Sequence, residues 1–178
     1  TVNVSAAGVT FCNCRFMAGF ADITSAFTLT TAKSFTLDSC DFAKTSTFVF
    51  DNIIDGSTVD NDQDGLTVCG CSWVDSSTSN NGFVKLDATA DSVRFINNYI
   101  NLGLVNDVGA AFNVAAGKLL TNFWADGNRV RRLITSDTGG GFVNIADGTT
   151  HTGILSNNYL QVNMAGTPIW VRASSGLA

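Results

Sequence analysis

Apolar and polar residues alternate in a short phrase that recurs six times along the chain. The phrase occupies residues 9–16, 35–42, 66–73, 93–100, 123–130 and 153–160. In each copy a small residue interrupts the alternation, and cysteine or asparagine follows it: Cys14, Cys40, Cys71, Asn98, Asn128 and Asn158. These positions lie 26, 31, 27, 30 and 30 residues apart. A period of that size predicts stacked repeats, each burying its apolar face against its neighbours.

A second column of apolar segments lies between the phrases. The segments begin at Phe27, Phe48, Phe83, Phe112, Phe142 and Ile169. Most of them alternate with the period of two that a half-buried strand requires. No Asn-Gly hairpin joins neighbouring phrases at close range, so equivalent strands of successive repeats should pair in parallel. We therefore predict an all-β fold, a right-handed parallel β-helix (solenoid) of about six rungs, with one outward bulge at residues 53–65.

The alternation also predicts which side chains stack inside the solenoid. Three inner files are expected, beginning Val9–Phe35–Leu66, Phe11–Leu37–Val68 and Phe16–Phe42–Trp73. Stacking like residues on successive rungs removes apolar surface from water, at ~25 cal/mol per Å². The cysteine and asparagine positions should form a structural inner ladder, because asparagine can bond its neighbour's backbone and tolerates unusual φ and ψ angles.

Composition and charge agree with strands and turns and narrow the possible partners. The chain is 45% hydrophobic and 14% charged, all 15 acidic residues are Asp, and no amphipathic helical run is present. A net charge of −5 argues against a nucleic-acid groove, and Arg129, Arg131 and Arg132 form only a small basic cluster. No apolar run approaches the roughly 18 residues of a membrane span, and no signal peptide is visible.

The chain has the length of one domain, so we expect residues 1–178 to form a single β-helix domain. The first phrase begins close to Thr1, the last apolar segment ends close to Ala178, and the sequence predicts no capping helix at either end. Open solenoid ends are unpaired strand edges that adhere to other chains. We therefore expect a segment of a longer protein, or caps supplied by partner subunits.

The cysteines favour a structural role over a metal site or disulfides. Their number is odd, and Cys14 and Cys71 are separated by two rungs with Cys40 between them. Metal ligands must converge on one shell of ~2.3 Å, and disulfides require facing side chains. Reduced cysteines acting as small hydrophobic residues fit better. We expect no metal and no cofactor.

An acidic segment at residues 60–65 matches the opening of a calcium loop. Asp60, Asp62 and Asp64 precede Gly65 with the spacing of D-x-[DN]-x-[DN]-G. Position twelve is Cys71 where a calcium loop has a bidentate glutamate, so these carboxylates are only weak calcium candidates beside the simpler interpretation of a solvated acidic turn.

No catalytic arrangement can be assembled from the sequence. Asp residues are so numerous that a close pair carries no information, and His151 lies in a Gly-Thr turn where exposure is the simpler interpretation. The alternation points Trp124 outward beside Arg94, and it points Trp170 outward above Thr28, Val49, Val84, Asn113 and Val143. Arg94, Trp124 and Trp170 are therefore candidates for glycan stacking or for a subunit interface.

The repeated phrase, in forms such as VTFCNCRF, VRFINNYI and ILSNNYL, resembles the right-handed β-helix repeat of pectate-lyase-like proteins. It is especially similar to β-helix domains of phage structural proteins, namely tailspikes, fibres and capsid decoration knobs. The resemblance covers nearly the whole chain. It implies a component of the virion surface, commonly a trimer. The lyases' catalytic arginine and calcium-binding aspartates do not map onto this sequence, so no catalytic residue is carried over.

We therefore predict a non-enzymatic structural protein at the virion surface, a capsid decoration or tail fibre module. The expected partners are two further copies in a homotrimer, other virion proteins and host surface carbohydrate. The alternatives are a carbohydrate-active tailspike, either a depolymerase or a polysaccharide lyase, and a bacterial β-helix adhesin. Product release from host polysaccharide would distinguish an enzyme from the non-enzymatic proteins.

Overall fold

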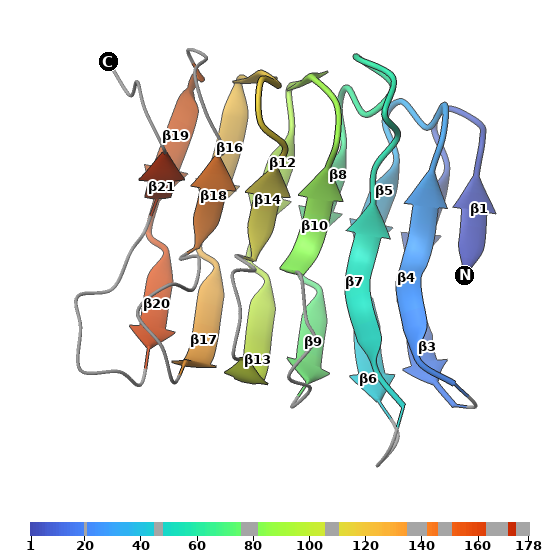
Figure 1. Ribbon diagram of the computed structural model, residues 1–178, viewed down its shortest axis with the longest axis vertical. Coiled ribbons are helices and arrows are strands. Elements are labelled where there is room, and N and C mark those ends of the chain that lie inside the picture. Colours follow the sequence, from blue (N-terminus) through green and yellow to red (C-terminus); the bar gives the residue numbers. More distant parts are fainter. Residues whose placement is uncertain are drawn as a thin grey trace.

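The computed structural model confirms an all-β chain wound as a parallel β-solenoid (Figure 1). The structure describes residues 1–19, 21–44, 48–75, 82–105, 111–134, 142–145, 151–162 and 171–173. Within these residues no helix occurs, and every strand pairing is parallel. This parallel direction is the one predicted from the absence of short hairpin turns between successive repeats of the sequence phrase.

The described residues form three long sheets and one short sheet. Sheet A contains β1 (Val2–Val4), β4 (Ile23–Leu29), β7 (Phe50–Asp55), β10 (Gly82–Leu86), β14 (Phe112–Val114), β18 (Val143–Ile145) and β21 (Val171–Ala173). Sheet B contains β2 (Thr10–Cys12), β5 (Thr36–Asp38), β8 (Thr67–Cys69), β12 (Arg94–Ile96), β16 (Phe123–Asp126) and β19 (Gly153–Ser156). Sheet C contains β3 (Arg15–Ala18), β6 (Asp41–Lys44), β9 (Ser72–Asp75), β13 (Tyr99–Val105), β17 (Arg129–Ile134) and β20 (Tyr159–Val162). Sheet D contains β11 (Ala90–Asp91) and β15 (Leu120–Thr121).

The number of rungs differs slightly from the expected six. Sheets B and C have six strands each, whereas sheet A has seven. The outermost strands are paired on one side only, which leaves about 4 turns that are flanked by a neighbour on both sides. Paired turns satisfy their backbone groups through the next turn, so these inner turns carry most of the regular hydrogen bonding.

The inner files predicted from the alternation are confirmed in sheets B and C. Phe11 pairs with Leu37, and Leu37 pairs with Val68. The same file continues through Phe95, Ala125 and Leu155. In sheet C the file runs through Phe16, Phe42, Trp73, Ile100, Val130 and Leu160. A period of two fixes which face each residue occupies, so the register follows once one pair is aligned.

The expected register of the second column is wrong in sheet A. Phe27 pairs with Ile54 and not with the segment that begins at Phe48, because β7 extends to Asp55. The six-residue shift leaves the alternation unchanged, so the pattern cannot detect it. The outward bulge therefore begins after β7 and not at Ile53, which is fully buried.

A second shift in sheet A arises where two consecutive residues are buried. Val84 pairs with Phe112, and Phe112 pairs with Val143. Phe83, near the start of β10, and Phe142, just before β18, are also buried. Alternation gives no register where two consecutive residues are both buried, as Phe83 and Val84 are and as Phe142 and Val143 are.

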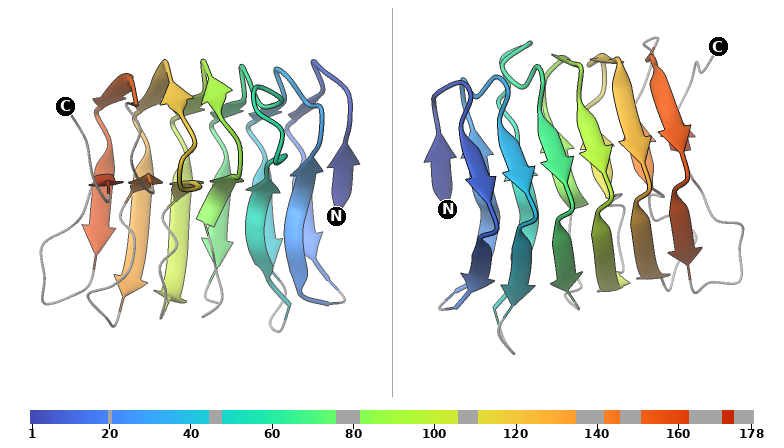
Figure 2. Two further views of the ribbon diagram at one scale, coloured as in Figure 1. Left: turned by 45° about the horizontal axis from the view of Figure 1, so that its top comes forward. Right: turned by 180° about the vertical axis from the view of Figure 1, so that it is seen from behind.

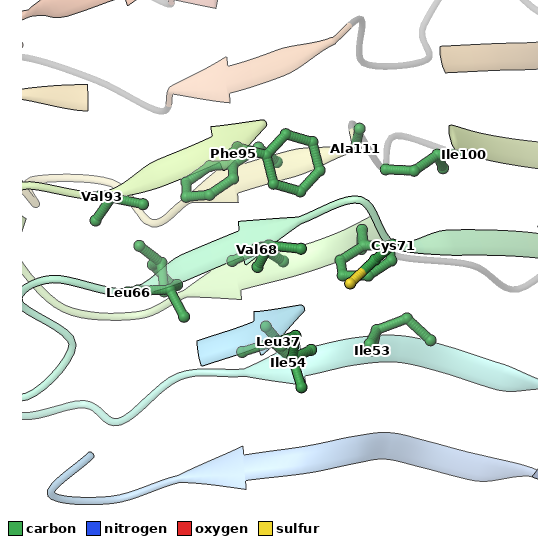
Figure 3. Packing of buried hydrophobic residues seen from close by; sticks show 14 of the residues in the cluster. Leu37, Ile53, Ile54, Leu66, Val68, Cys71, Val93, Phe95, Ile100 and Ala111 are labelled. Carbon is green, nitrogen blue, oxygen red and sulfur yellow. The ribbon is translucent and has the colours of Figure 1, made fainter. Parts of the chain in front are cut away.

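The hydrophobic core lies between sheet A and the other sheets. Figure 3 shows Leu37, Val68 and Phe95 on successive rungs with their side chains directed into the interior, and Ile54 from sheet A beside Leu37. The Phe95 ring lies 5.8 Å from the rings of Phe83 and Phe112, centroid to centroid. This aromatic packing joins neighbouring rungs, so no rung can bury its side chains alone.

Sheets B and C together form one long face. Seen from behind, in the right panel of Figure 2, the strands of sheet B continue into those of sheet C across a bend. We call the outward side chains of these two sheets the back face. Sheet A covers the opposite side of the core (Figure 1).

Candidate functional site

The bend between sheets B and C contains one residue with positive φ on every rung. These residues are Asn13, Ser39, Gly70, Asn97, Gly127 and Asn157, with φ between 52° and 63°. Each stands one position before the cysteine or asparagine of the inner ladder, so the unusual backbone expected at the ladder residue lies one residue earlier. Asn and Gly adopt this region at low cost, and a Cβ added at Gly127 would collide with Asn97 Oδ1. The bend therefore fixes where sheet B ends and sheet C begins.

Three asparagines form a hydrogen-bonded ladder inside this bend. Asn128 Oδ1 accepts from the backbone N of Asn98 at 3.0 Å and from its Nδ2 at 2.9 Å. Asn158 Oδ1 accepts in the same way from Asn128, at 3.0 and 2.8 Å. Each Nδ2 also donates to a strand carbonyl, those of Val68, Phe95 and Ala125. The side chains thus hydrogen-bond both to backbone N–H groups of the bend and to carbonyls of the strand before it.

Cysteines continue the same file on the N-terminal rungs. The ladder changes from cysteine to asparagine between Cys71 and Asn98, where the backbone N of Cys71 donates to Asn98 Oδ1 at 2.9 Å. Cys40 and Cys71 are each 1% exposed, and all five cysteines are free thiols. Burial raises the pKa of Cys40 and raises that of Cys71 to about 12. These thiols are therefore held in the neutral form and pack as small side chains.

We expect thiol labelling of the native protein to follow burial. A maleimide reagent near neutral pH should modify the exposed Cys12 first and leave Cys40 and Cys71 unmodified, because a buried neutral thiol is a poor nucleophile. Mass spectrometry of peptides after timed quenching measures the order. Urea-unfolded chain, in which all five thiols should react, is the control. Labelling of Cys71 as fast as that of Cys12 in the native protein would contradict the buried ladder.

The three calcium candidates are bonded to separate donors of the protein. Asp60 accepts from Thr89 N and Lys118 Nζ, Asp62 from Ser57 Oγ, and Asp64 from Asp91 N. The backbone N–H of Thr89 and then the Lys118 ammonium hold the pKa of Asp60 below its usual value. No group of three or more metal-ligating side chains occurs in the part of the chain that the structure describes. The carboxylates are thus not assembled around a common point.

Trp124 and Arg94 lie side by side on the back face, in the outward file that the sequence predicted. Arg94 pairs with Thr67 and Trp124, and Trp124 pairs with Ile154. Trp124 is 43% exposed and Ile154 is 64% exposed. Trp170 lies outside the described residues. Its expected file is wrong, because Val84 pairs with Phe112 and not with Asn113.

Sequence reasoning missed an outward file of sheet C that contains an arginine between two tyrosines. Tyr99 pairs with Arg129, and Arg129 pairs with Tyr159. The guanidinium carbon of Arg129 lies 6.0 Å from the ring centroid of Tyr99 and 5.4 Å from that of Tyr159. The signal was present, since the three residues each follow their ladder asparagine by one position. It would have been found by aligning the outward residues as carefully as the inner ones.

Lys85, on β10, is held between two carboxylates. Its Nζ lies 2.6 Å from Asp87 Oδ2 and 3.3 Å from Asp55 Oδ1. Burial lowers the pKa of Lys85, but the hydrogen bond to Asp87 and the charge of Asp55 outweigh it and leave the pKa raised. A protonated, ion-paired lysine is a poor general base, so this group does not favour a lyase mechanism.

His151 is half-buried and accepts a backbone hydrogen bond, in contrast to the exposed turn residue expected. Leu120 N donates to His151 Nδ1 at 3.0 Å. Burial lowers the pKa of His151 below its ordinary value of 6.5. Accepting at Nδ1 requires the neutral ring, so the imidazole contributes its bond only when unprotonated.

Stability should therefore fall as the pH drops below the ordinary pKa of histidine. A group with a depressed pKa in the folded state is protonated first in the unfolded chain, so its contribution is present above pH ~6.5 and is lost below it. Thermal unfolding between about pH 7 and about pH 5 should show a falling midpoint, above the range in which aspartate titrates. His151→Asn, which keeps an acceptor oxygen but does not titrate here, should flatten the curve. An identical pH dependence in that variant would assign the effect to other groups.

The fold and the ladder define the class: this is a parallel β-solenoid protein with an asparagine ladder in one bend. Comparison with protein-family models, with curated proteins and with solved structures gives no match. Among the described residues, no helix could cross a membrane. The functional argument is therefore built on the side chains of the back face.

Proposed function

We propose that this protein is a non-enzymatic structural component of a virion surface, in which the solenoid packs side by side with identical chains as a homotrimer. The repeated phrase resembles that of phage β-helix proteins, and the parallel solenoid fold agrees with that resemblance. Other virion proteins are its further partners, and the head or the tail of the particle is the expected location.

The observation that carries the lateral packing is an exposed apolar strip on the back face. One outward file of sheet C contains Met17, Ala43 and Val74 on three successive rungs. Met17 is 56% exposed and Val74 is 49% exposed. Contiguous apolar residues on a flat, rigid sheet are typical of protein–protein contacts. Farther along, the same file becomes polar at Asn101, Arg131 and Gln161, so the strip is confined to the N-terminal rungs.

Size-exclusion chromatography with light scattering tests the assembly. The intact chain should have the mass of a trimer, and Val74→Lys should shift it toward monomer by placing a charge in the contact. Val59→Lys is the matched control, because Val59 is 59% exposed but belongs to a loop outside the long sheets. A monomeric wild-type chain at all accessible concentrations would refute lateral packing.

Location and lack of catalysis are tested separately. Antibody labelling of purified particles should place the chain on their outer surface. Host polysaccharide incubated with the protein should release neither new reducing ends nor unsaturated products. Release of either product would replace this proposal with a tailspike depolymerase or lyase.

A further inference from the structure

The C-terminal rungs of sheet C present two adjacent outward files of different chemistry. The first is Tyr99–Arg129–Tyr159, and the second is Asn101–Arg131–Gln161. All six residues are on β13, β17 and β20, separated along each strand by one inward residue. We call these six residues the tyrosine–arginine strip.

The arginines of this strip differ in their ion pairing from four cations elsewhere in the solenoid. Arg15, Lys33, Lys85 and Lys118 each lie within 2.6 to 3.7 Å of an aspartate oxygen. No aspartate of the described residues pairs in this way with Arg129 or Arg131, and Arg131 Nε has no hydrogen-bond partner. In a chain with 15 Asp and 10 Lys and Arg, arginines that pair with no aspartate of the described part of the chain form a local positive site that fits an anionic ligand.

The strip is already arranged to bind. The Arg129 guanidinium lies between the two tyrosine rings, which restricts its rotamers before any ligand arrives. Tyr99 is 38% exposed and Tyr159 is 53% exposed, so part of each ring remains accessible. Side chains on adjacent rungs are held by the sheet at a spacing of ~4.8 Å, which places the two tyrosines about 10 Å apart. Preorganised groups lose little entropy on binding.

We infer that the tyrosine–arginine strip binds an acidic polysaccharide, with the chain of sugars lying across the rungs. Arg129 holds a sugar carboxylate in a bidentate pair, the tyrosine rings stack on the apolar faces of neighbouring sugars, and Asn101, Arg131 and Gln161 bond hydroxyl groups. This inference rests on the proposed function, since it gives the surface component its host ligand.

The pattern favours a glycan over other anions. Nucleic acid carries a phosphate at every nucleotide, and a protein of net charge −5 with one short line of arginines repels such a dense charge. An acidic polysaccharide carries its carboxylates farther apart, between neutral rings. The alternation of aromatic and cationic groups, with amide side chains alongside, matches that distribution.

Isothermal titration calorimetry with the intact chain tests the inference, using a hexamer of galacturonic acid and a neutral galactose hexamer as probes. The acidic hexamer should bind and the neutral one should bind at least about tenfold more weakly, the loss expected for one charge-assisted contact. Arg129→Gln should weaken binding of the acidic probe by a similar factor, and Tyr159→Ala should also weaken it. Added salt should reduce the affinity.

Arg15→Gln is the matched control, because Arg15 belongs to the same outward file but is paired with Asp41 on the N-terminal rungs. It should leave the affinity unchanged within about twofold, and both arginine variants should keep the wild-type thermal midpoint. Equal loss in the two variants, equal binding of the two hexamers, or no binding of either would overturn the inference. Tighter binding of single-stranded DNA or polyaspartate through Arg129 would also overturn it.

Light scattering on the same samples separates this inference from the proposed function. A trimer that binds neither hexamer refutes the glycan site and leaves the assembly standing. A monomer that binds the acidic hexamer through Arg129 supports the site and refutes lateral packing.

Discussion

Replacing Phe95 with alanine should lower the free energy of unfolding by about 4 kcal/mol, the usual cost of removing a buried aromatic ring. Phe95 is fully buried in β12, with the rings of Phe83 and Phe112 each 5.8 Å away and that of Phe142 at 6.2 Å. The cavity would open between sheets A and B, where strands on both sides are paired with neighbouring rungs and cannot close around it. The cost combines the transfer free energy of the ring with the dispersion attraction between the ring and the side chains around it.

Urea unfolding followed by far-ultraviolet circular dichroism measures this destabilisation, and a thermal midpoint lower by roughly 10 °C should accompany it. Phe95→Leu is the control, because it retains most of the volume and should cost about 1 kcal/mol. Leu37, at the same position of the file two rungs away, shows that leucine suits this site. If alanine and leucine variants unfold at the same urea concentration, Phe95 does not fill the space that the structure assigns to it.

Replacing Asn128 with alanine should cost about 3 kcal/mol, although it removes few atoms. The side chain accepts from Asn98 at two atoms and donates to Asn158 Oδ1 and to Phe95 O. Without it, the buried backbone N–H of Asn98 has no acceptor and the carbonyl of Phe95 is left without this donor. Each buried polar group left without a partner costs ~1–3 kcal/mol.

Asn144→Ala is the matched control for this prediction. Asn144 Nδ2 also donates to an asparagine one rung away, Asn113 Oδ1 at 3.3 Å, but the pair is only half-buried on sheet A. Water can replace that bond, so the destabilisation should stay below about 1 kcal/mol. The same unfolding experiment measures both variants. Equal destabilisation would show that the ladder in the bend has no special role.

The recurring phrase was sufficient to predict the winding of the chain. Alternation assigned one inner file of sheet B and one of sheet C, since shifting Leu37 by one position would have exposed an apolar file and buried threonines. The cysteine and asparagine positions were placed in one file by the same argument. In sheet A the alternation did not give the register, because Phe48 and Ile54 satisfy the pattern equally well as partners of Phe27. Only the structure shows that the partner is Ile54.

The functional surface was less predictable than the core. The alternation placed Arg94 and Trp124 in the outward file of sheet B, where they follow three threonines. The strip centred on Arg129 was overlooked, because a tyrosine that follows an asparagine carries no signal until three such rungs are aligned. Whether a cationic side chain has an acidic partner depends on side-chain geometry across rungs, as the ion pair between Lys85 and Asp55 shows. Spacing along the chain does not reveal such a pair.

The sequence by itself determined the repeat, the parallel pairing and the identity of the inner files in sheets B and C, because these depend only on a period of two within strands and a period near 29 between them. Only the tertiary structure decided the register of sheet A, the hydrogen bonds of the ladder and the absence of an ion pair between Arg129 and any aspartate of the described residues. These depend on distances between atoms far apart in sequence, which no local pattern encodes.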